Sequence, residues 1–403
     1  MSVLNDLGRA LNTPVAAGHE VVVAEILTAI GLMSGTSLDG IDVALLRTDG
    51  ERIAEVGPAR TYPYADHDRN LFRAAYRDAI HLSDRDGRSG ALAEAEVLIT
   101  RRHAEAVERF AGDTGADGAA ADLVGFHGQT VFHDPARALT VQIGDGQALA
   151  DRLSVPVVWD FRADDVAAGG QGAPLAPVFH RALADSAGTP RPLVFLNIGG
   201  VANVTYVGAD GELIAFDTGP GNALLDDWTF ARTGAMFDDG GRLAASGTVS
   251  REHLEALLSH PFFDLPAPKS LDRNAFPVSR LADLSDADGA ATLLAFSAAS
   301  VARSVERLPA RPHGWYASGG GRHNTTMMQA IQSALHDMPL LPLESLGYDG
   351  DATEAQAFAF LAVRSLRGLP LSYPGTTGVA GPTTGGRISR PATRGSAGLG
   401  ISG

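Results

Sequence analysis

Residues 160–174 combine acidic, basic and glycine residues directly after an apolar run. They begin Asp-Phe-Arg-Ala-Asp-Asp, and the strand-like run Val-Pro-Val-Val-Trp precedes them at 155–159. Ligands of open α/β sheets bind outside the carboxyl ends of the strands, so a carboxylate here could act as a general base with the arginine as its orienting partner. A solvated loop with Asp helix caps and an Arg–Asp pair accounts for the same residues, and both interpretations stay open at this point.

Four glycine-rich turns follow strand-like runs and could hold phosphate groups. They lie at residues 34–40, 197–200, 217–222 and 319–321. Small residues let backbone N–H groups and hydroxyls approach an anion closely. Taken alone, the first turn is also what an ordinary hairpin requires. Four such turns at strand ends favour a nucleotide, with one turn on each side of its phosphates and an additional glycine turn that lets the adenosine lie flat.

Aspartates accompany two of these turns, and they bear on the cofactor. Asp39 and Asp217 would repel phosphate unless a divalent cation lies between them, so the ATP interpretation implies Mg²⁺, with Asp39 as the expected metal ligand. No Gly-Lys-Ser/Thr pattern occurs, and the single lysine, Lys269, lies far from the turns in sequence. The sequence therefore excludes a P-loop NTPase and predicts Mg-ATP.

Polar residues at three further places are candidates for chemistry. His127, Gln129 and Thr130 follow a strand without the spacing of a metal site, so contact with substrate hydroxyls is their expected functional use. His103 lies on a helical pattern and is expected at the surface. Glu354 stands at a predicted helix start, where the helix dipole alone favours a carboxylate.

Composition narrows the class of protein. The chain has 403 residues with 32 Lys and Arg against 47 Asp and Glu, a net charge of −15, which argues against nucleic acid as a partner. It has no cysteine, which excludes disulfides, iron–sulfur clusters and a thiol nucleophile. No apolar run reaches 18 residues and no signal peptide is recognisable, so we expect a cytoplasmic enzyme that avoids membranes.

Two stretches share the same order of strands and turns. Residues 26–56 and 192–222 each read as an apolar strand, a glycine turn, a second strand, an Asp-Gly turn and a third strand. Such a repeat predicts two similar α/β lobes. We place an N-terminal extension at 1–25, the lobes at 26–190 and 191–375, and a partly disordered tail at 376–403.

Seven strings carry a family resemblance between about Ile30 and about Pro374. In chain order they are IGLMSGTSLDGIDVAL, FHGQTVFHDP, TVQIGDGQALA, DFRADDVAAGGQGAPL, LNIGGVANVT, FDTGPGNALLDDW and TEAQAFAFLA. Together they resemble the anhydro-N-acetylmuramic acid kinases. The resemblance implies an actin-like, hexokinase-type ATPase fold: two related lobes, each a ribonuclease H-like unit, with a cleft between them. It also implies that 1,6-anhydro-N-acetylmuramic acid, ATP and water give N-acetylmuramic acid 6-phosphate and ADP, in peptidoglycan recycling.

The resemblance also implies roles for individual residues. Asp165 matches the catalytic aspartate of an Arg-x-x-Asp pattern before Gly-Gly-Gln-Gly, and Glu354 matches the active-site glutamate. We expect His127, Gln129, Thr130, Asp160, Arg162 and Gln171 to bind the sugar. We expect the nucleotide at Ser34, Gly35, Thr36, Ser37, Leu38, Asp39, Gly40, Ile41, Asp42, Gly199, Gly200, Asn203, Asp217, Gly219, Gly319, Gly320 and Gly321.

The sequence departs from the family pattern around Lys269, where it reads Ala-Pro-Lys-Ser-Leu-Asp-Arg-Asn, and its terminal string YPGTTGVAG is a loose version of that pattern. These departures concern local loop and tail contacts and sugar specificity. Two other functions stay open: an ordinary hexose or amino-sugar kinase of the same fold, and an actin-like ATPase that forms filaments or switches shape. A homodimer is a further expectation, for which the residues themselves give no information.

Overall fold

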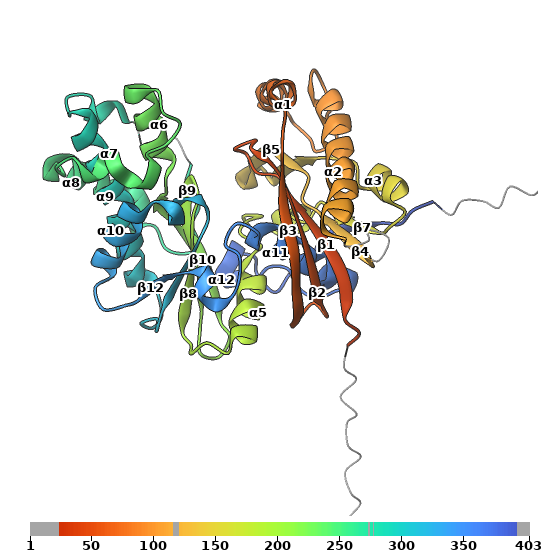
Figure 1. The fold of residues 1–403 in the computed structure, drawn as a ribbon. Coiled ribbons are helices and arrows are strands. Elements are labelled where there is room, and N and C mark those ends of the chain that lie inside the picture. The colour runs from red at the N-terminus through yellow and green to blue at the C-terminus, as the bar shows by residue number, and fades with distance from the viewer. Residues whose placement is uncertain (1–23, 116–120, 273–274, 277, 393–403) are drawn as a thin grey trace, which may run out of the picture.

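Two mixed β-sheets form the frame of the molecule. The computed structural model describes residues 24–115, 121–272, 275–276 and 278–392. The lobes built on the two sheets lie side by side, with α11 (Thr353–Leu366) and α12 (Pro374–Thr377) between them (Figure 1). Most of the predicted N-terminal extension and the last part of the predicted tail lie outside the described residues.

The first sheet has the strand order β13-β7-β4-β1-β2-β3. Strands β1 to β3 form an antiparallel meander, β4 and β7 continue parallel to β1, and β13 pairs antiparallel with β7. The sheet consists of β1 (Leu27–Met33), β2 (Gly40–Thr48), β3 (Ile53–Pro63), β4 (Leu123–Phe126), β7 (Val157–Trp159) and β13 (Arg387–Ser389).

The second sheet repeats this arrangement. Its order is β10-β9-β8-β11-β12, again with an antiparallel meander followed by two parallel strands. Its strands are β8 (Leu193–Ile198), β9 (Val201–Val207), β10 (Leu213–Pro220), β11 (Trp315–Ser318) and β12 (Leu340–Pro342). The two predicted meanders and the internal repeat are therefore confirmed. A separate hairpin, β5 (Gln129–Asp134) with β6 (Leu139–Ile143), belongs to the first lobe.

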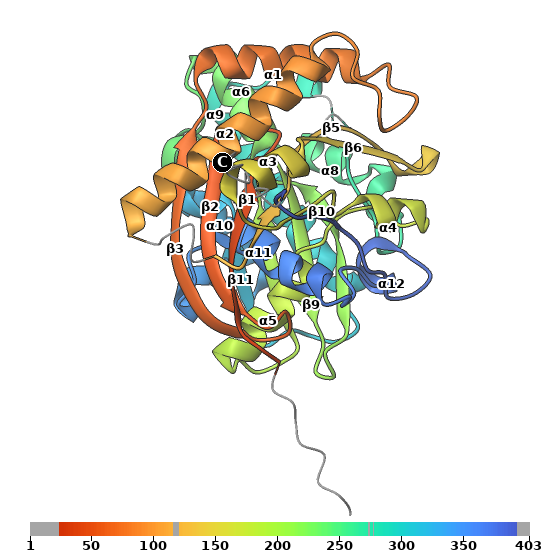
Figure 2. The same cartoon turned by 90° about the vertical axis from the view of Figure 1, so that its right-hand side faces the viewer.

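Helices cover the outer face of each sheet, because alternate strand residues point to opposite faces. In the first lobe, the outer helices α1 (Asp66–Ala79), α2 (Leu92–Thr114) and α3 (Gly146–Leu153) lie against the first sheet (Figure 2). Ile30 and Leu32 of β1 pack into one cluster with residues of these helices. In the second lobe, Val194 and Leu196 of β8 pack with α6 (Ala223–Thr233), α7 (Arg242–Ala245), α8 (Arg251–Leu258), α9 (Asp286–Ser304) and α10 (Thr325–Leu335).

The inner faces of both sheets share one buried cluster. Ala29 of β1 and Phe195 of β8 belong to it together with residues of α5 (Pro177–Ala187) and α11. Strand β1 contacts α11 so closely that a Cβ on Gly31 would lie 1.8 Å from the carbonyl oxygen of Ala355. The absence of a side chain at Gly31 thus fixes α11 on the first sheet, with its N-terminus at the carboxyl end of β1.

The position of His103 differs from expectation. His103 is fully buried on α2, so the expectation of a surface position is wrong: its Nδ1 lies 2.8 Å from the Ile99 carbonyl oxygen, and its ring packs edge-on against Phe126.

In the predicted tail, residues 387–389 form β13 at the edge of the first sheet. Among the described helices, none has the length and apolar character that crossing a membrane requires.

Candidate active site

Asp165 lies at the centre of the predicted site and is 2% exposed. It belongs to α4 (Ala163–Ala167), a single turn after the carboxyl end of β7. Its Oδ1 accepts a 2.6 Å hydrogen bond from the Gly172 N–H, and its Oδ2 accepts one of 2.6 Å from the Thr377 hydroxyl. The Gln171 N–H in turn donates to the Thr377 carbonyl at 2.7 Å. The carboxylate is therefore held in one orientation by two separate segments.

Arg162 connects Asp165 to the segment after β4. Its guanidinium donates to His127 Nε2 at 3.0 Å and to the Gly172 carbonyl at 2.9 Å. The Nδ1 of His127 lies 2.9 Å from the Gly128 carbonyl, so a neutral ring with its proton on Nδ1 satisfies both contacts. Burial, followed by the charge of Arg162, lowers the pKa of His127 well below its usual value, which keeps this ring neutral.

Glu354 enters the site from the first turn of α11. Its side chain reaches solvent, yet the surrounding protein removes enough water to raise the pKa of its carboxyl, and the charge of Arg162 opposes that rise. Asp42 adds a like charge and raises the pKa further. Arg162 also acts electrostatically on Asp165. One arginine thus lies within electrostatic range of both carboxylates that the sequence singles out.

The first glycine turn is held by Gln129. The Ser34 hydroxyl donates to Gln129 Oε1 at 2.7 Å, and Gln129 Nε2 donates to the Gly35 carbonyl at 2.9 Å and to the Tyr76 hydroxyl oxygen at 2.6 Å. Both ends of the amide are therefore engaged by protein. Leu38 is buried while its φ is +61°, a left-handed value that is unusual for leucine and typical of a functionally constrained turn.

Space is open above two of the predicted nucleotide-binding glycines. A Cβ on Gly35 would meet only the Ser37 hydroxyl, at 3.7 Å, and one on Gly320 would meet nothing within 4 Å. Neither residue has a positive φ in the left-handed region. Neither backbone conformation nor packing therefore requires glycine at these two positions. A ligand that lies against the backbone would require it, because a side chain would fill the space.

Three glycine turns meet in the second lobe. The Gly221 N–H donates to the Gly200 carbonyl at 3.0 Å, and a Cβ on Gly221 would lie 2.0 Å from the Gly199 carbonyl oxygen. Gly319 has a φ of +78°, and a Cβ there would lie 2.4 Å from Asn197 Oδ1. The predicted second, third and fourth turns thus form one contiguous structure at the ends of β8, β10 and β11.

Arg322 joins that structure to the start of α11. It is 8% exposed and donates to the Gly319 carbonyl at 3.1 Å, to Glu344 Oε1 at 2.8 Å and to Asp351 Oδ1 at 2.6 Å. The charge of Asp351 in turn contributes to a raised pKa of Asp42, after the larger effect of burial. The fourth turn, the start of α11 and the end of the first turn are therefore electrostatically connected.

Other predicted site residues have protein partners. Asp160 is 5% exposed and pairs with Arg85 and, at 3.1 Å, with Arg387 of β13. Thr130 Oγ1 accepts from Gln142 Nε2 at 3.3 Å. Asp217 Oδ2 accepts a 2.7 Å bond from the Leu271 N–H. Asn203 lies on β9, where it is in register with Asn197 and Asp217.

The carboxylates near the first glycine turn are the candidate ligands for Mg²⁺. Within the described ranges, no group of three or more His, Asp or Glu side chains is arranged to hold a metal ion. Mg²⁺ in kinases is usually bound by one or two carboxylates together with phosphate oxygens and water. Asp39 is exposed on the first turn and Asp42 follows it, so the residues present fit a magnesium ion that arrives with the nucleotide.

The duplicated strand order and the glycine turns at the strand ends define a two-lobed ATPase of the actin-like fold class. The chain belongs to the anhydro-N-acetylmuramic acid kinase family, whose model matches residues 27–391. Over 366 residues it is 55% identical to the anhydro-N-acetylmuramic acid kinase of Rhodopseudomonas palustris and 53% identical to that of Bradyrhizobium diazoefficiens. In both comparisons 91% of this chain and all of the relative are covered.

Solved structures give a more distant likeness. The activator of the 2-hydroxyisocaproyl-CoA dehydratase from Clostridium difficile matches with a TM-score of 0.42 and 13% identity, over 85% of this chain and 96% of that one. The ROK hexokinase from Thermus thermophilus matches with a TM-score of 0.36 and 16% identity, over 85% of this chain and all of that one.

Sequence reasoning missed three residues that hold the site together. Thr377 fixes Asp165, Tyr76 accepts from Gln129, and Arg322 links the fourth turn to α11. Tyr76 lies outside the motifs that drew attention, and Thr377 lies in the terminal string YPGTTGVAG, which matches the family pattern only loosely. Arg322 directly follows the Gly319–Gly321 turn, so a charged residue beside a glycine turn was the one available signal.

Proposed function

We propose that this chain is an ATP-dependent kinase that opens the 1,6-anhydro bridge of 1,6-anhydro-N-acetylmuramic acid and phosphorylates O6. The products are N-acetylmuramic acid 6-phosphate and ADP, and the reaction belongs to peptidoglycan recycling. Membership of the family supports the substrate. The convergence of Asp165, Arg162 and Glu354 beside the first glycine turn is the observation that carries the proposal for this chain.

Asp165 is the general base in this mechanism. Its carboxylate takes a proton from a water molecule as the water oxygen bonds to C1 of the sugar. The C1–O6 bond breaks on the opposite face, and its electron pair stays on O6. O6 then bonds to the γ-phosphorus of ATP while the bond to the β-phosphate oxygen breaks. Hydrogen bonds from Gly172 and Thr377 orient the carboxylate for the first step.

The remaining residues bind and orient. Backbone N–H groups of the first turn and of residues 199–200 contact the phosphates, and residues 319–321 contact the adenosine. Asp39 would hold Mg²⁺, which neutralises phosphate charge when it is bound. We propose that Arg162 contacts sugar hydroxyls and that buried His127, whose two ring nitrogens have protein partners, orients this guanidinium. Glu354 sets the electrostatic environment of the anomeric centre, where positive charge develops as the C1–O6 bond breaks.

The structure suggests supporting roles for two predicted sugar ligands. Gln129 holds the first turn through both ends of its amide, so we propose that it positions the phosphate-binding backbone. Asp160 anchors β13 through Arg387, so we propose that it secures the strand edge beside α4. Their effects on sugar binding would then be indirect.

An isotope experiment tests the hydrolytic mechanism. Turnover of the anhydro sugar with ATP in ¹⁸O-labelled water should place one label on C1 of the sugar product and none in its phosphate. Unlabelled product, incubated in the same water with Asp165→Asn enzyme, measures background exchange at C1. A product without label above that background would favour an ordinary kinase, in which Asp165 deprotonates a free hydroxyl of the sugar and the 1,6-anhydro bridge stays closed.

A substrate comparison separates the same alternatives by rate. ADP release with the anhydro sugar should greatly exceed ADP release with N-acetylmuramic acid or N-acetylglucosamine. Equal rates on open sugars would support a general amino-sugar kinase. Long polymers that sediment in the presence of ATP would support the filament alternative. We further propose a cytoplasmic enzyme, since ATP is a substrate, and a homodimer, which analytical ultracentrifugation would test.

A further inference from the structure

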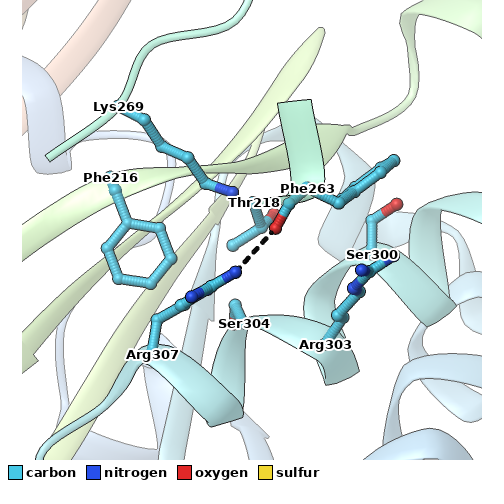
Figure 3. Close-up of a pocket in the computed structure, with 8 residues that line it drawn as sticks. All are labelled: Phe216, Thr218, Phe263, Lys269, Ser300, Arg303, Ser304 and Arg307. Atoms are coloured by element: carbon cyan, nitrogen blue, oxygen red, sulfur yellow. Dashed lines mark hydrogen bonds between the residues drawn. The ribbon is translucent and has the colours of Figure 1, made fainter. Parts of the chain in front are cut away.

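A small pocket in the second lobe gathers three basic side chains away from the carboxylates of the candidate active site. It lies between β10, the short helix η4 (Pro261–Asp264) and the end of α9, and its volume is about 10 Å³. Lys269, Arg303 and Arg307 line it (Figure 3). Lys269 is the single lysine of the chain and is only 9% exposed.

Two of these cations are bound only by neutral groups. Lys269 Nζ donates to the Phe262 carbonyl at 3.0 Å and lies 4.2 Å from the centre of the Phe262 ring. Arg307 donates to the Phe263 carbonyl at 3.0 Å. In the part of the chain that the structure describes, neither forms an ion pair, whereas Arg303 pairs with Asp264 at 3.1 Å. Lys269 and Arg307 retain N–H groups that these carbonyls do not use.

The charges around the pocket do not cancel. The charged groups acting most strongly on Lys269 are Arg307 and Arg303, which disfavour its protonation, and Asp264 and Asp217, which favour it. Three cations thus face two carboxylates, an excess of one positive charge when all five groups are ionised. Burial contributes most to lowering the pKa of Lys269, to about 8, so at neutral pH its ammonium persists without a carboxylate bonded to it.

Size and hydrogen bonding restrict what can enter. A cavity of about 10 Å³ has room for roughly one water-sized particle, so a monatomic halide, which is somewhat larger than water, enters with small shifts of the flexible Lys269 and Arg307 side chains. Tetrahedral phosphate or sulfate needs much more space. The hydroxyls of Ser300, Ser304 and Thr218 donate to backbone carbonyls of Phe296, Val301 and Ala202, so their protons are engaged. The free donors are the N–H groups of the basic side chains.

We propose that this pocket binds a single monovalent halide, chloride in the cell, between Lys269 and Arg307. The ion supplies the one negative charge that the cluster lacks and accepts the N–H groups that carbonyls leave free. Its binding also stabilises the segment around Lys269, whose backbone carbonyl accepts a 2.9 Å bond from the Asp217 N–H. The halide thus supports the strand end that leads into the third glycine turn, and the site is independent of the proposed reaction.

Thermal unfolding at constant ionic strength tests the site. Stepwise replacement of gluconate by chloride should raise the Tm along a saturating curve, by roughly 1–3 °C for a chain of this size. The Arg307→Gln variant should lose this response, because it lacks the charge. Arg311→Gln is the matched control, since Arg311 pairs with exposed Asp337 outside the pocket, and it should keep the response. Equal responses in both variants would overturn the proposal.

Crystallography of the unaltered protein gives a test that does not depend on variant folding. A crystal soaked in bromide should show an anomalous peak between Lys269 Nζ and the Arg307 guanidinium. Water refined at that position without anomalous signal would contradict halide binding. A stabilisation by sulfate that requires Arg307, with no effect of chloride, would show an oxyanion site instead and would equally overturn the assignment.

Discussion

The hydroxyl of Thr377 donates a 2.6 Å hydrogen bond to Oδ2 of Asp165, although 212 positions separate the two residues in the chain. Thr377 is fully buried, as is Asp165 at 2% exposure. The backbone carbonyl of Thr377 also accepts the Gln171 N–H. The segment of α12 is therefore joined at two points, to Asp165 of α4 and to Gln171 in the loop after it. The orientation of the proposed base therefore depends on a segment from the far end of the chain.

Replacement of Thr377 by valine should lower kcat and leave the KM values for both substrates close to their normal level. A hydrogen bond to a charged group contributes about 1.5–3 kcal/mol, which corresponds to a loss of roughly tenfold to a hundredfold in rate. Thr377→Ser should restore most of the activity because it keeps the hydroxyl. Steady-state kinetics with both substrates checks this, and a fully active valine variant would show that the bond has no part in catalysis.

A matched threonine separates this effect from a general loss of packing. The Thr383 hydroxyl donates to the Gly381 carbonyl at 2.9 Å and bonds to no predicted site residue. Thr383→Val should therefore keep kcat within about twofold of the unaltered enzyme. A similar drop in both variants would assign the Thr377 effect to stability.

Local patterns predicted the repeated meanders and the glycine turns because each is determined within a few neighbouring residues. The β1–β3 strands and the Ser34–Gly40 turn are examples. Contacts between segments that are distant in the chain leave no local pattern, so they could not be predicted in this way. Tyr76 and Thr377 show no pattern that distinguishes them from other buried polar residues, and the pairing of Arg387 with Asp160 requires β13 to be known. Asp160 and Arg162 have the same sequence context, yet one anchors the sheet edge and the other contacts His127.

His103 shows the limit of an amphipathic pattern and gives a pH prediction. Burial lowers its pKa from 6.5 to about 4, so the folded protein binds fewer protons than the unfolded chain between these values. Its contribution to the free energy of unfolding is complete above pH 6.5 and falls as the pH decreases towards 4. The loss is on the order of 3 kcal/mol. His103→Leu should remove this part of the acid sensitivity, measured as ΔG of unfolding by urea at several pH values.

The stability of the His103→Leu variant at pH 8 is the control for this pH prediction. The Nε2 atom of His103 is buried without a partner, so leucine removes an unsatisfied polar atom while losing one contact to the Ile99 carbonyl. Stability at pH 8 should change little compared with the change at pH 4.5. An unaltered pH dependence would mean that His103 does not titrate in the folded or unfolded chain as its burial implies.

Two glycines on either side of the same strand end should respond in opposite ways to added side chains. Gly35→Val should leave the protein folded and weaken ATP binding, because the new side chain fills space that only Ser37 approaches. Gly31→Ala should instead destabilise the fold, because its Cβ would lie 1.8 Å from the Ala355 carbonyl oxygen. Calorimetric titration with nucleotide and thermal unfolding distinguish the two results. Normal ATP affinity in Gly35→Val would remove the first turn from the site.

Asp165→Asn tests the proposed base most directly. The amide keeps the shape of the side chain and can still accept the Gly172 N–H, so both substrates should bind with nearly normal affinity. It cannot take a proton from water, and loss of a well-placed general base usually lowers the rate by about 10²–10⁴-fold. Asp164→Asn is the internal control, because that neighbouring side chain is exposed, and it should keep most activity. If Asp165→Asn turns over normally while Asp164→Asn does not, the base is the adjacent aspartate, and the hydrogen bonds of Thr377 and Gly172 serve the fold alone.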